Sequence, residues 1–292
     1  MDKARKKTDK ELVKMERQIK KIYREARDDI GRKWIAYMEE MKPILEIYEK
    51  TYQNAKKFGD KEAIEKAGRE LAAVKREYTL QNKYYKDMVR ETSAHLTHAN
   101  ETALAYINKK MPKIYAINYN QMAEDTRLIE GYTFNMVNER AVRGITKTLN
   151  EAKDMAWNTR QINSQVLQGI IQGESIDKIA GRLEHIIGTN TAASIRTART
   201  MTTGAENRGR QDSYEQATED GIILKRVWVA TNDNRTREWH ADLDGVETDV
   251  DEPWENEIGE IMFPGDPSAD GANIYNCRCA MRVEVKGFDW RK

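Results

Sequence analysis

Residues 12–22 read LVKMERQIKKI, and the apolar residues in this stretch recur at spacings of three and four. Residues spaced in this way share one face of an α-helix. The same spacing continues as far as Tyr52, so it predicts one long amphipathic helix whose apolar seam is Leu12, Met15, Ile19, Ile22, Ala26, Ile30, Trp34, Tyr37, Met41, Ile44, Tyr48 and Tyr52. Pro43 lies inside this run, and we expect it to kink the helix or divide it in two.

A second helix is predicted after a turn at residues 57–60. Asp60 is a favoured N-cap residue. From Ile64 to Tyr106 the seam positions keep an unbroken heptad alternation, and Met111-Pro112 is expected to end the helix. The two helices most simply fold back on each other as an antiparallel, coiled-coil-like hairpin, which predicts an arm over residues 1–112.

The middle of the chain, residues 113–220, is predicted to be helical as well. A stripe of apolar residues from Ile176 to Ile186 is more typical of a small core helix than of a DNA-binding helix-turn-helix. Residues 191–217 predict a further helix that carries a row of arginines: Arg196, Arg199, Arg208 and Arg210. Such a row binds phosphate or pairs with carboxylates, and the acidic C-terminal segment is the expected partner.

After Gly221 the pattern changes to a period of two. Residues 222–230 predict a strand, residues 235–243 a short helix that carries His240, and residues 259–263 and 279–285 two further strands. We therefore expect a mainly α fold, with long antiparallel helices in an elongated N-terminal region and a small α+β module at residues 221–292.

The charge of the chain changes sign along its length. Residues 1–113 hold 28 Lys and Arg against 19 Asp and Glu, whereas residues 211–292 hold 9 against 19. The basic part predicts either contact with nucleic acid or an ordinary solvated helix surface. The chain has no apolar run of about 18 residues, which excludes a membrane-spanning helix. Residues 1–7 lack the apolar core of a signal peptide, so we expect synthesis in the cytoplasm and no membrane partner.

The two cysteines, Cys277 and Cys279, are one residue apart. A disulfide between them would close a small, strained ring, so we expect reduced thiols. Thiolates and a neutral imidazole are common zinc ligands, and His240 belongs to the same acidic module. The residues leave three alternatives open: one structural Zn²⁺, a metal-free core, or a catalytic metal with Asp244 as base.

A closed zinc site needs four donors. Asp233 and Asp242 are the nearest candidates, so the predicted ligands are His240, Cys277, Cys279 and Asp233. In the metal-free alternative, Asn276 and Arg278 bond the turn at residues 243–245 while the thiols pack inward. The module has one histidine, no Gly-rich phosphate loop and no surplus of Lys and Arg. We therefore expect no enzymatic activity.

Several motifs follow one another between roughly residues 165 and 286. They are Ala198-Arg199-Thr200; Trp228 with Asp233 just beyond it; Arg237 with His240; Leu243-Asp244-Gly245; Phe263-Pro264-Gly265-Asp266-Pro267; and Asn276-Cys277-Arg278-Cys279. This order resembles the phage head morphogenesis family, the Mu F-like minor capsid proteins of tailed bacteriophages and prophages.

The resemblance implies a minor head protein, present in few copies, that associates with the portal vertex inside the procapsid and assists head assembly or DNA delivery. The implied partners are the portal protein and capsid or scaffold proteins, and the implied location is the virion after assembly in the bacterial cytoplasm. From the residues themselves, non-specific DNA contact and oligomer formation through the N-terminal helices are further expectations. A DNA-binding head protein is an alternative function, and a metal-dependent nuclease or hydrolase is a less favoured one.

Overall fold

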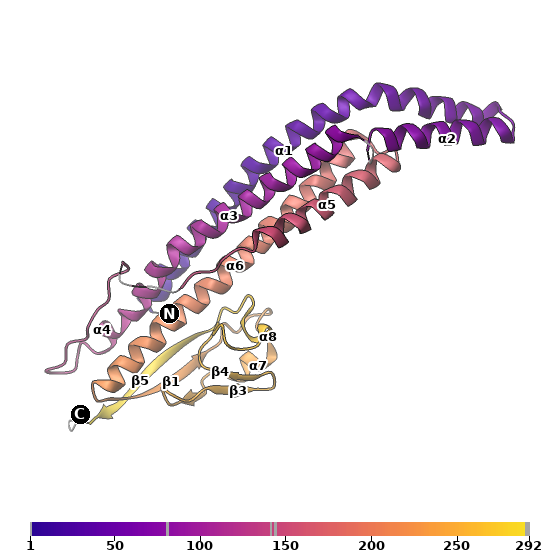
Figure 1. Ribbon diagram of the computed structural model, residues 1–292. Helices are drawn as coiled ribbons and strands as arrows, with labels where there is room; N and C mark the ends of the chain where they lie inside the picture. Colours follow the sequence, from indigo (N-terminus) through magenta and orange to yellow (C-terminus); the bar gives the residue numbers. More distant parts are fainter. Residues whose placement is uncertain (1, 80–81, 141, 143–144, 290–292) are drawn as a thin grey trace. The chain divides into compact units, whose positions relative to one another are not determined.

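The computed structural model describes residues 2–79, 82–140, 142 and 145–289 (Figure 1). Its long helices are α1 (Lys3–Phe58), α2 (Lys61–Glu77), α3 (Lys83–Tyr119), α5 (Glu151–Ile171) and α6 (Ile176–Glu219), with the short α4 (Gln121–Asp125) between α3 and α5. The remaining elements are β1 (Ile222–Val229), α7 (Glu238–Ala241), β2 (Glu247–Thr248), β3 (Trp254–Asn256), β4 (Gly259–Ile261), α8 (Gly271–Ile274) and β5 (Ala280–Phe288). The predicted fold class is confirmed: long N-terminal helices are followed by a small module with antiparallel strands.

The chain groups into two compact units, each built from separate segments. The first unit combines residues 1–19, 103–148 and 193–292, and the second combines residues 20–102 and 149–192. Helices α1, α3 and α6 therefore contribute residues to both units. The three-part division at residues 112/113 and 220/221 stays a prediction.

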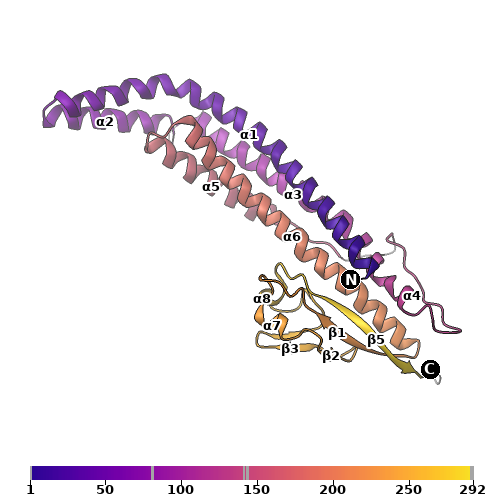
Figure 2. The same cartoon turned by 180° about the vertical axis from the view of Figure 1, so that it is seen from behind.

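The second unit is a bundle of helices that run side by side in both views (Figures 1 and 2). Its aromatic core centres on Trp34, whose ring lies 5.8 Å from the ring of Tyr37 and 6.0 Å from that of Tyr85. The indole nitrogen of Trp34 donates to the hydroxyl of Thr92 at 2.8 Å. Asp60 accepts a hydrogen bond from the amide of Ala63 at 2.9 Å, so its predicted role as the N-cap of α2 is confirmed.

The structure corrects two predictions about helix ends. Helix α1 continues through Pro43, so the predicted division is wrong. Pro43 has no N–H to donate to the carbonyl of Glu39, which an ordinary residue would bond in a helix. Because both residues are exposed, water can bond this carbonyl instead. Helix α3 likewise continues through Pro112, which was expected to end it.

The predicted second helix is also not continuous. Helix α2 ends at Glu77 and α3 begins at Lys83. The side chain of Asn82 accepts from the amide of Tyr85 at 3.1 Å, as an N-cap does. No glycine or proline marks this break, and the heptad alternation runs across it.

The first unit contains a three-stranded antiparallel sheet of order β2-β1-β5 and a separate β3-β4 pair. Strand β1 confirms the strand predicted at residues 222–230, and it pairs with β5 from Ile222 opposite Phe288 to Val229 opposite Ala280. The sheet shares an apolar core with α6, in which Trp228, Trp254 and Met281 pack with Tyr214. Strand β5 begins at Ala280, so Cys279, which was predicted to begin this strand, precedes it together with Cys277.

Within the described residues, no helix combines the length and apolar character that crossing a membrane requires.

Candidate metal centre

His240, Cys277 and Cys279 come together in the first unit. Their side chains are buried, with exposed fractions of 1, 2 and 3%. The Nδ1 atom of His240 lies 3.7 Å from the sulfur of Cys277 and 3.6 Å from that of Cys279. All three donor atoms lie within 4.8 Å of one another. This cluster could bind a metal ion.

The spacing of the donors fits a tetrahedral ion. Zinc bonds to sulfur and nitrogen are about 2.3 Å and about 2.0–2.1 Å long, so tetrahedral S and N donors stand about 3.6 Å apart. The two observed separations match this value. Both cysteines are free thiols, which a metal requires.

The two sulfurs differ in protonation. A hydrogen bond from Cys277 and, next, the contact with His240 lower the pKa of the Cys279 thiol to about 5, against the opposing effect of burial. The same contact, with burial, raises the pKa of Cys277. At neutral pH one thiolate therefore already faces the imidazole nitrogen. A thiolate is the form in which cysteine binds metals.

Three neighbours orient the His240 ring. Helix α7 carries it, and the Trp228 ring lies edge-on at 5.3 Å. The Oδ1 atom of Asn273 lies 3.3 Å from Nε2 of the ring. In a metal-bound form, an Nε2–H donated to Asn273 would leave the lone pair of Nδ1 free to bind the ion. Such a partner commonly fixes the tautomer of a metal-binding histidine.

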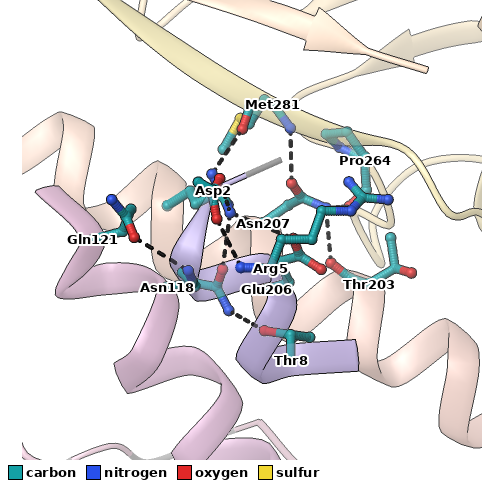
Figure 3. Close-up of polar contacts among 12 residues, drawn as sticks. Asp2, Arg5, Thr8, Asn118, Gln121, Thr203, Glu206, Asn207, Pro264 and Met281 are labelled. Carbon is teal, nitrogen blue, oxygen red and sulfur yellow. Dashed lines mark hydrogen bonds and ion pairs between the residues drawn. The ribbon is translucent and has the colours of Figure 1, made fainter. Parts of the chain in front are cut away.

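Helix α6 holds the cysteine segment through its backbone. Thr203 donates to the carbonyl of Cys277 at 2.6 Å, and Asn207 donates to the carbonyls of Pro264 and Cys279 at 3.0 and 3.2 Å. Asn207 also accepts from the amide of Met281 at 3.1 Å (Figure 3). One buried amide thus joins α6 to two loops and to the start of β5.

The structure does not place Asp233 with the three donors. Arg278 binds both of its carboxylate oxygens, at 2.5 and 2.6 Å, and this contact lowers the pKa of Asp233 well below its usual range. Asp242 is exposed, and among the described residues the cluster comprises His240, Cys277 and Cys279 alone. A side chain that supplies a fourth bond to a metal is therefore not identified.

Asp244 is the residue that a catalytic site would use as a base, but its carboxylate accepts local hydrogen bonds instead. It accepts from the amide of Ala230 at 2.8 Å and from the side chain of Asn232 at 2.6 Å. Gly245, at φ +78°, donates its amide to the carbonyl of Trp228 at 2.9 Å, and Leu243 is buried in the core. The 243–245 turn is thus tied to β1, whereas Arg278 pairs with Asp233 and not with this turn.

The remaining motif residues hold loops around the cluster. Arg237 donates to the carbonyl of Tyr275, and the amide of Asn276, at φ +56°, donates to the hydroxyl of Thr200 at 3.1 Å. Asp266 accepts from the amide and hydroxyl of Ser268. Gly265, at φ +83°, lies against Gly204 so closely that a Cβ atom would stand 2.8 Å from the Gly204 nitrogen.

The arginine row on α6 pairs with carboxylates outside the acidic module. Arg199 contacts Glu16 at 2.7 Å, and Arg210 contacts Asp2 at 2.8 Å. Arg210 also lies 3.5 Å from Glu206, whose pKa is raised by burial. The C-terminal module contributes a main-chain contact, since Arg210 donates to the carbonyl of Met281. The expected partners from the C-terminal module were wrong for Arg199 and Arg210, because Glu16 of α1, Asp2 just before α1 and Glu206 of α6 take that place.

Sequence reasoning missed Asn207, Asn273 and Arg226. Arg226 is fully buried in β1 and binds Gln211, the carbonyls of Met262 and Asp249, and the face of Trp254. Burial lowers its pKa to about 10. The alternation of β1, which places a charged residue among inward-facing apolar ones, was a usable signal for Arg226. No comparable signal marked the two asparagines.

A family model described as Phage Mu protein F like protein matches residues 160–282. This stretch is a Mu F-like region. The match includes α6, His240 and both cysteines, and the resemblance predicted from the order of motifs is confirmed.

Curated relatives extend this finding. The minor head protein GP7 of Bacillus phage SPP1 is 26% identical over 199 residues, which is 64% of each chain. The NAD(+)–arginine ADP-ribosyltransferase EFV of Enterococcus faecalis is 33% identical over 163 residues, 54% of this chain and 32% of that protein. The protein YqbB of Bacillus subtilis is 29% identical over 152 residues, 48% of this chain and 49% of that protein.

The chain thus spans between about a third and just under two thirds of the length of these relatives. The match to EFV covers a minor part of that protein, so the activity in its name is not carried over. No solved structure gives a significant match.

Proposed function

We propose that this chain is a minor head protein of a tailed phage or prophage. The observation that carries the proposal is the Mu F-like match at residues 160–282 together with the alignment to a minor head protein over 64% of each chain. In this proposal a few copies associate with the portal inside the procapsid and assist head assembly or DNA delivery. The protein then remains in the virion.

The metal centre has a structural role in this proposal. Its donors are buried, and α6 fixes the cysteine segment through backbone hydrogen bonds. A bound Zn²⁺ would link His240, before the β3-β4 pair, to the two cysteines that precede β5. Such a link would stabilise a small module whose connections are mostly turns. The fourth position would be completed by water or by a backbone atom.

The test is co-expression of this chain with the portal protein encoded by the same phage or prophage, followed by analytical ultracentrifugation. We expect a complex that contains both proteins in a defined ratio. The same experiment with the major capsid protein is the comparison. Portal association would be contradicted if the chain sediments separately from the portal protein but forms a complex with the major capsid protein.

A second candidate function, non-specific DNA binding, is favoured by one surface of α1. Lys6, Lys10 and Arg17 lie on one face at spacings of four and seven, are exposed, and have no carboxylate partner among the described residues. Two of the acids near them are engaged elsewhere, since Glu11 contacts Lys110 and Lys113, and Glu16 contacts Arg199.

This candidate predicts a steep salt dependence. Three phosphate contacts give a slope of roughly −2.7 in a plot of log K against log salt concentration for duplex DNA. Replacing Lys6, Lys10 and Arg17 with Ser is expected to remove most of this slope. A triple replacement of Lys42, Lys50 and Lys61, which are exposed elsewhere, is the matched control. Equal loss in both variants would argue against a defined DNA surface.

A further inference from the structure

A pocket of about 1140 Å³ lies in the first unit and excludes the three metal-binding side chains. Its lining comes from Tyr115 of α3, from α6, from residues 137, 142 and 145–147, and from two loops of the C-terminal module, at 263–268 and 274–276. The second of these loops leads directly into Cys277. This volume slightly exceeds the range of about 300–1,000 Å³ that is typical of ligand pockets, and neither the candidate metal centre nor the proposed DNA surface uses it.

Two asparagines, Asn108 of α3 and Asn120 just after it, hold Val137 and Lys147 at one side of the pocket. Asn120 donates to the carbonyl of Val137 at 2.9 Å and accepts from its amide at 2.8 Å. Asn108 makes the same pair of bonds with Lys147, at 2.8 and 3.0 Å. Each asparagine side chain therefore bonds both the N–H and the C=O of one residue, as a neighbouring β-strand would. Val137 and Lys147 both line the pocket.

The opposite side of the pocket is apolar and closely fitted. Met201 and Gly204 of α6 lie beside Phe263 and Ile274. A Cβ atom on Gly204 would stand 3.0 Å from the carbonyl oxygen of Gly265, so the loop and the helix touch at this point. Because residues 204 and 265 are both glycines, the two backbones can make this contact, which holds the 263–268 loop in place at the side of the pocket.

The charges around the pocket favour an acidic ligand. Asp212 accepts a hydrogen bond from Tyr115 at 2.6 Å and forms an ion pair with Arg208 at 2.7 Å, and Asp266 accepts from Ser268. Arg196 is exposed on α6, and no acidic partner for it occurs in the described part of the chain. Lys147 is likewise exposed and unpaired in those residues. The unsatisfied charge at the pocket is thus positive.

We propose that this pocket binds an extended segment of another head protein, with apolar side chains at its centre and carboxylates at its flanks. Arg196 and Lys147 are the cations of the lining that remain for such carboxylates, since Arg208 is paired with Asp212. This inference rests on the proposed function in one respect: that function identifies the partner as a head protein.

Nucleic acid fits this pocket less well. A phosphate backbone is held by several cations, whereas the lining here is largely apolar and Arg208 is already paired with Asp212. A single-stranded oligonucleotide therefore serves as the competing probe in the test.

The test uses the full chain and an array of heptapeptides. Three central positions hold Leu, Ile or Phe, and the two residues on each side are Asp, Ser or Lys. We expect the Asp-flanked series to bind and the Lys-flanked series not to bind. Arg196→Glu is expected to weaken the bound peptides about tenfold or more, the size of one charge-assisted contact. Lys178→Glu, the same change elsewhere on α6, should leave binding within about twofold.

A second pair of variants locates the site without changing charge. Ala193 lines the pocket and Ala192 is its exposed neighbour outside the lining. Ala193→Trp is expected to abolish binding, whereas Ala192→Trp is not, with thermal melts confirming that both fold. The proposal is overturned if no series binds, if Asp-flanked and Lys-flanked peptides bind alike, if Ala193→Trp binds normally, or if a dT12 oligonucleotide displaces the peptides at lower concentration than they bind. Because this assay contains no head or portal, its outcome is independent of the proposed head function.

Discussion

Cys277 and Cys279 are one residue apart, yet their thiols have opposite pKa shifts. The pKa of Cys279 falls to about 5, whereas that of Cys277 rises, because one sulfur donates a hydrogen bond to the other. Zinc binds thiolates, so binding must displace the remaining proton. We predict that zinc uptake at pH 7 releases about one proton per ion.

Isothermal titration calorimetry in buffers of different ionisation enthalpy measures this number. Cys277→Ser is expected to reduce proton release to near zero and to weaken binding. A release of two protons from the unmodified protein would show that both thiols start protonated and would contradict the assigned pKa of Cys279.

Glu11 links α1 to α3 within the first unit. It is 4% exposed and lies within 3.4 Å of Lys14, Lys110 and Lys113. These contacts, first the hydrogen bond from Lys14, lower its pKa from 4.5 to about 2. A folded-state pKa below the unfolded value stabilises the protein above about pH 4.5, and the contribution is lost as the pH falls through about 2.

We therefore predict that Glu11→Gln lowers the free energy of unfolding at pH 7 by about 2–3 kcal/mol. The variant should also lose less stability than the unmodified protein between pH 4.5 and pH 2. Urea denaturation across this range measures both effects. Glu25→Gln, in an exposed pair with Lys21, should change stability by less than about 0.5 kcal/mol. Parallel pH profiles for Glu11→Gln and the unmodified protein would refute the prediction.

At this scale the sequence identified His240, Cys277 and Cys279, because cysteine and histidine are rare in this chain and have distinctive chemistry. It did not identify the engagement of Asp233 by Arg278. That pairing depends on how a turn at residue 233 meets a loop 45 residues later. Ligand type is a local property of a sequence, whereas competition between partners is set by the tertiary structure.

Helix α6 positions the C-terminal module, and Asn207 makes three of the contacts. Asn207→Leu would leave the carbonyls of Pro264 and Cys279 and the amide of Met281 without this partner. Each unsatisfied buried group costs about 1–3 kcal/mol. We predict a loss of at least about 3 kcal/mol, with faster hydrogen exchange in β5 and reduced zinc content.

The matched control for this variant is Asn163→Leu, another asparagine on a long helix but in the second unit. It should leave the zinc content and the exchange of β5 unchanged. Unchanged exchange in Asn207→Leu would mean that the module holds its own shape without α6.

The helices of the second unit share a buried polar layer. Asn100 donates to Asp154 at 2.7 Å and to Asn190 at 2.9 Å, and it accepts from Tyr23. Asn158 donates to Asp154 and to Thr97. Polar layers of this kind fix the register of packed helices.

We predict that Asn100→Leu destabilises the second unit by about 2–4 kcal/mol, because Asn190, Tyr23 and Asp154 lose a buried partner. Chemical denaturation followed by circular dichroism measures this loss. Asn54→Leu, on the exposed part of α1, is the control. Unfolding of Asn100→Leu at the same urea concentration as the control would show that the layer adds no stability.

Most of the elements were predictable because amphipathic repeats and strand alternation are strong local signals. The seam from Leu12 to Tyr52 predicted α1, and the alternation at residues 222–230 predicted β1. Helix ends were less predictable. Pro43 and Pro112 were tolerated, whereas the break before Asn82 occurs without glycine or proline. The balance among solvation, capping and packing determines where these helices begin and end.

At the scale of the whole chain, three helices serve both units. Removing residues 1–110 would therefore also remove Asp2, Glu11 and Glu16, which pair with Arg210, Lys113 and Arg199 in the first unit. A truncation that tests the arm must spare these residues. Glu49 and Lys75 lie 3.1 Å apart on α1 and α2, so residues 50–74 can be replaced by a short Gly-Ser linker.

We predict that this shortened chain keeps the zinc content and the stability of the first unit, and that its incorporation into heads falls at least about fivefold. The reason is that we propose the tip of the α1-α2 hairpin as the part that docks on other head proteins, and this tip is lost while the Mu F-like region is intact. Quantitative mass spectrometry of purified heads measures incorporation. Normal incorporation would show that the tip of the α1-α2 hairpin plays no part in docking.

The most direct test of the central proposal is the amount of this chain in purified heads of the phage or prophage that encodes it, measured with and without the portal protein. We predict a few copies per head, far fewer than the major capsid protein, and their loss from heads assembled without the portal. Absence from normal heads, or an unchanged amount in heads that lack the portal, would contradict a portal-associated minor head protein.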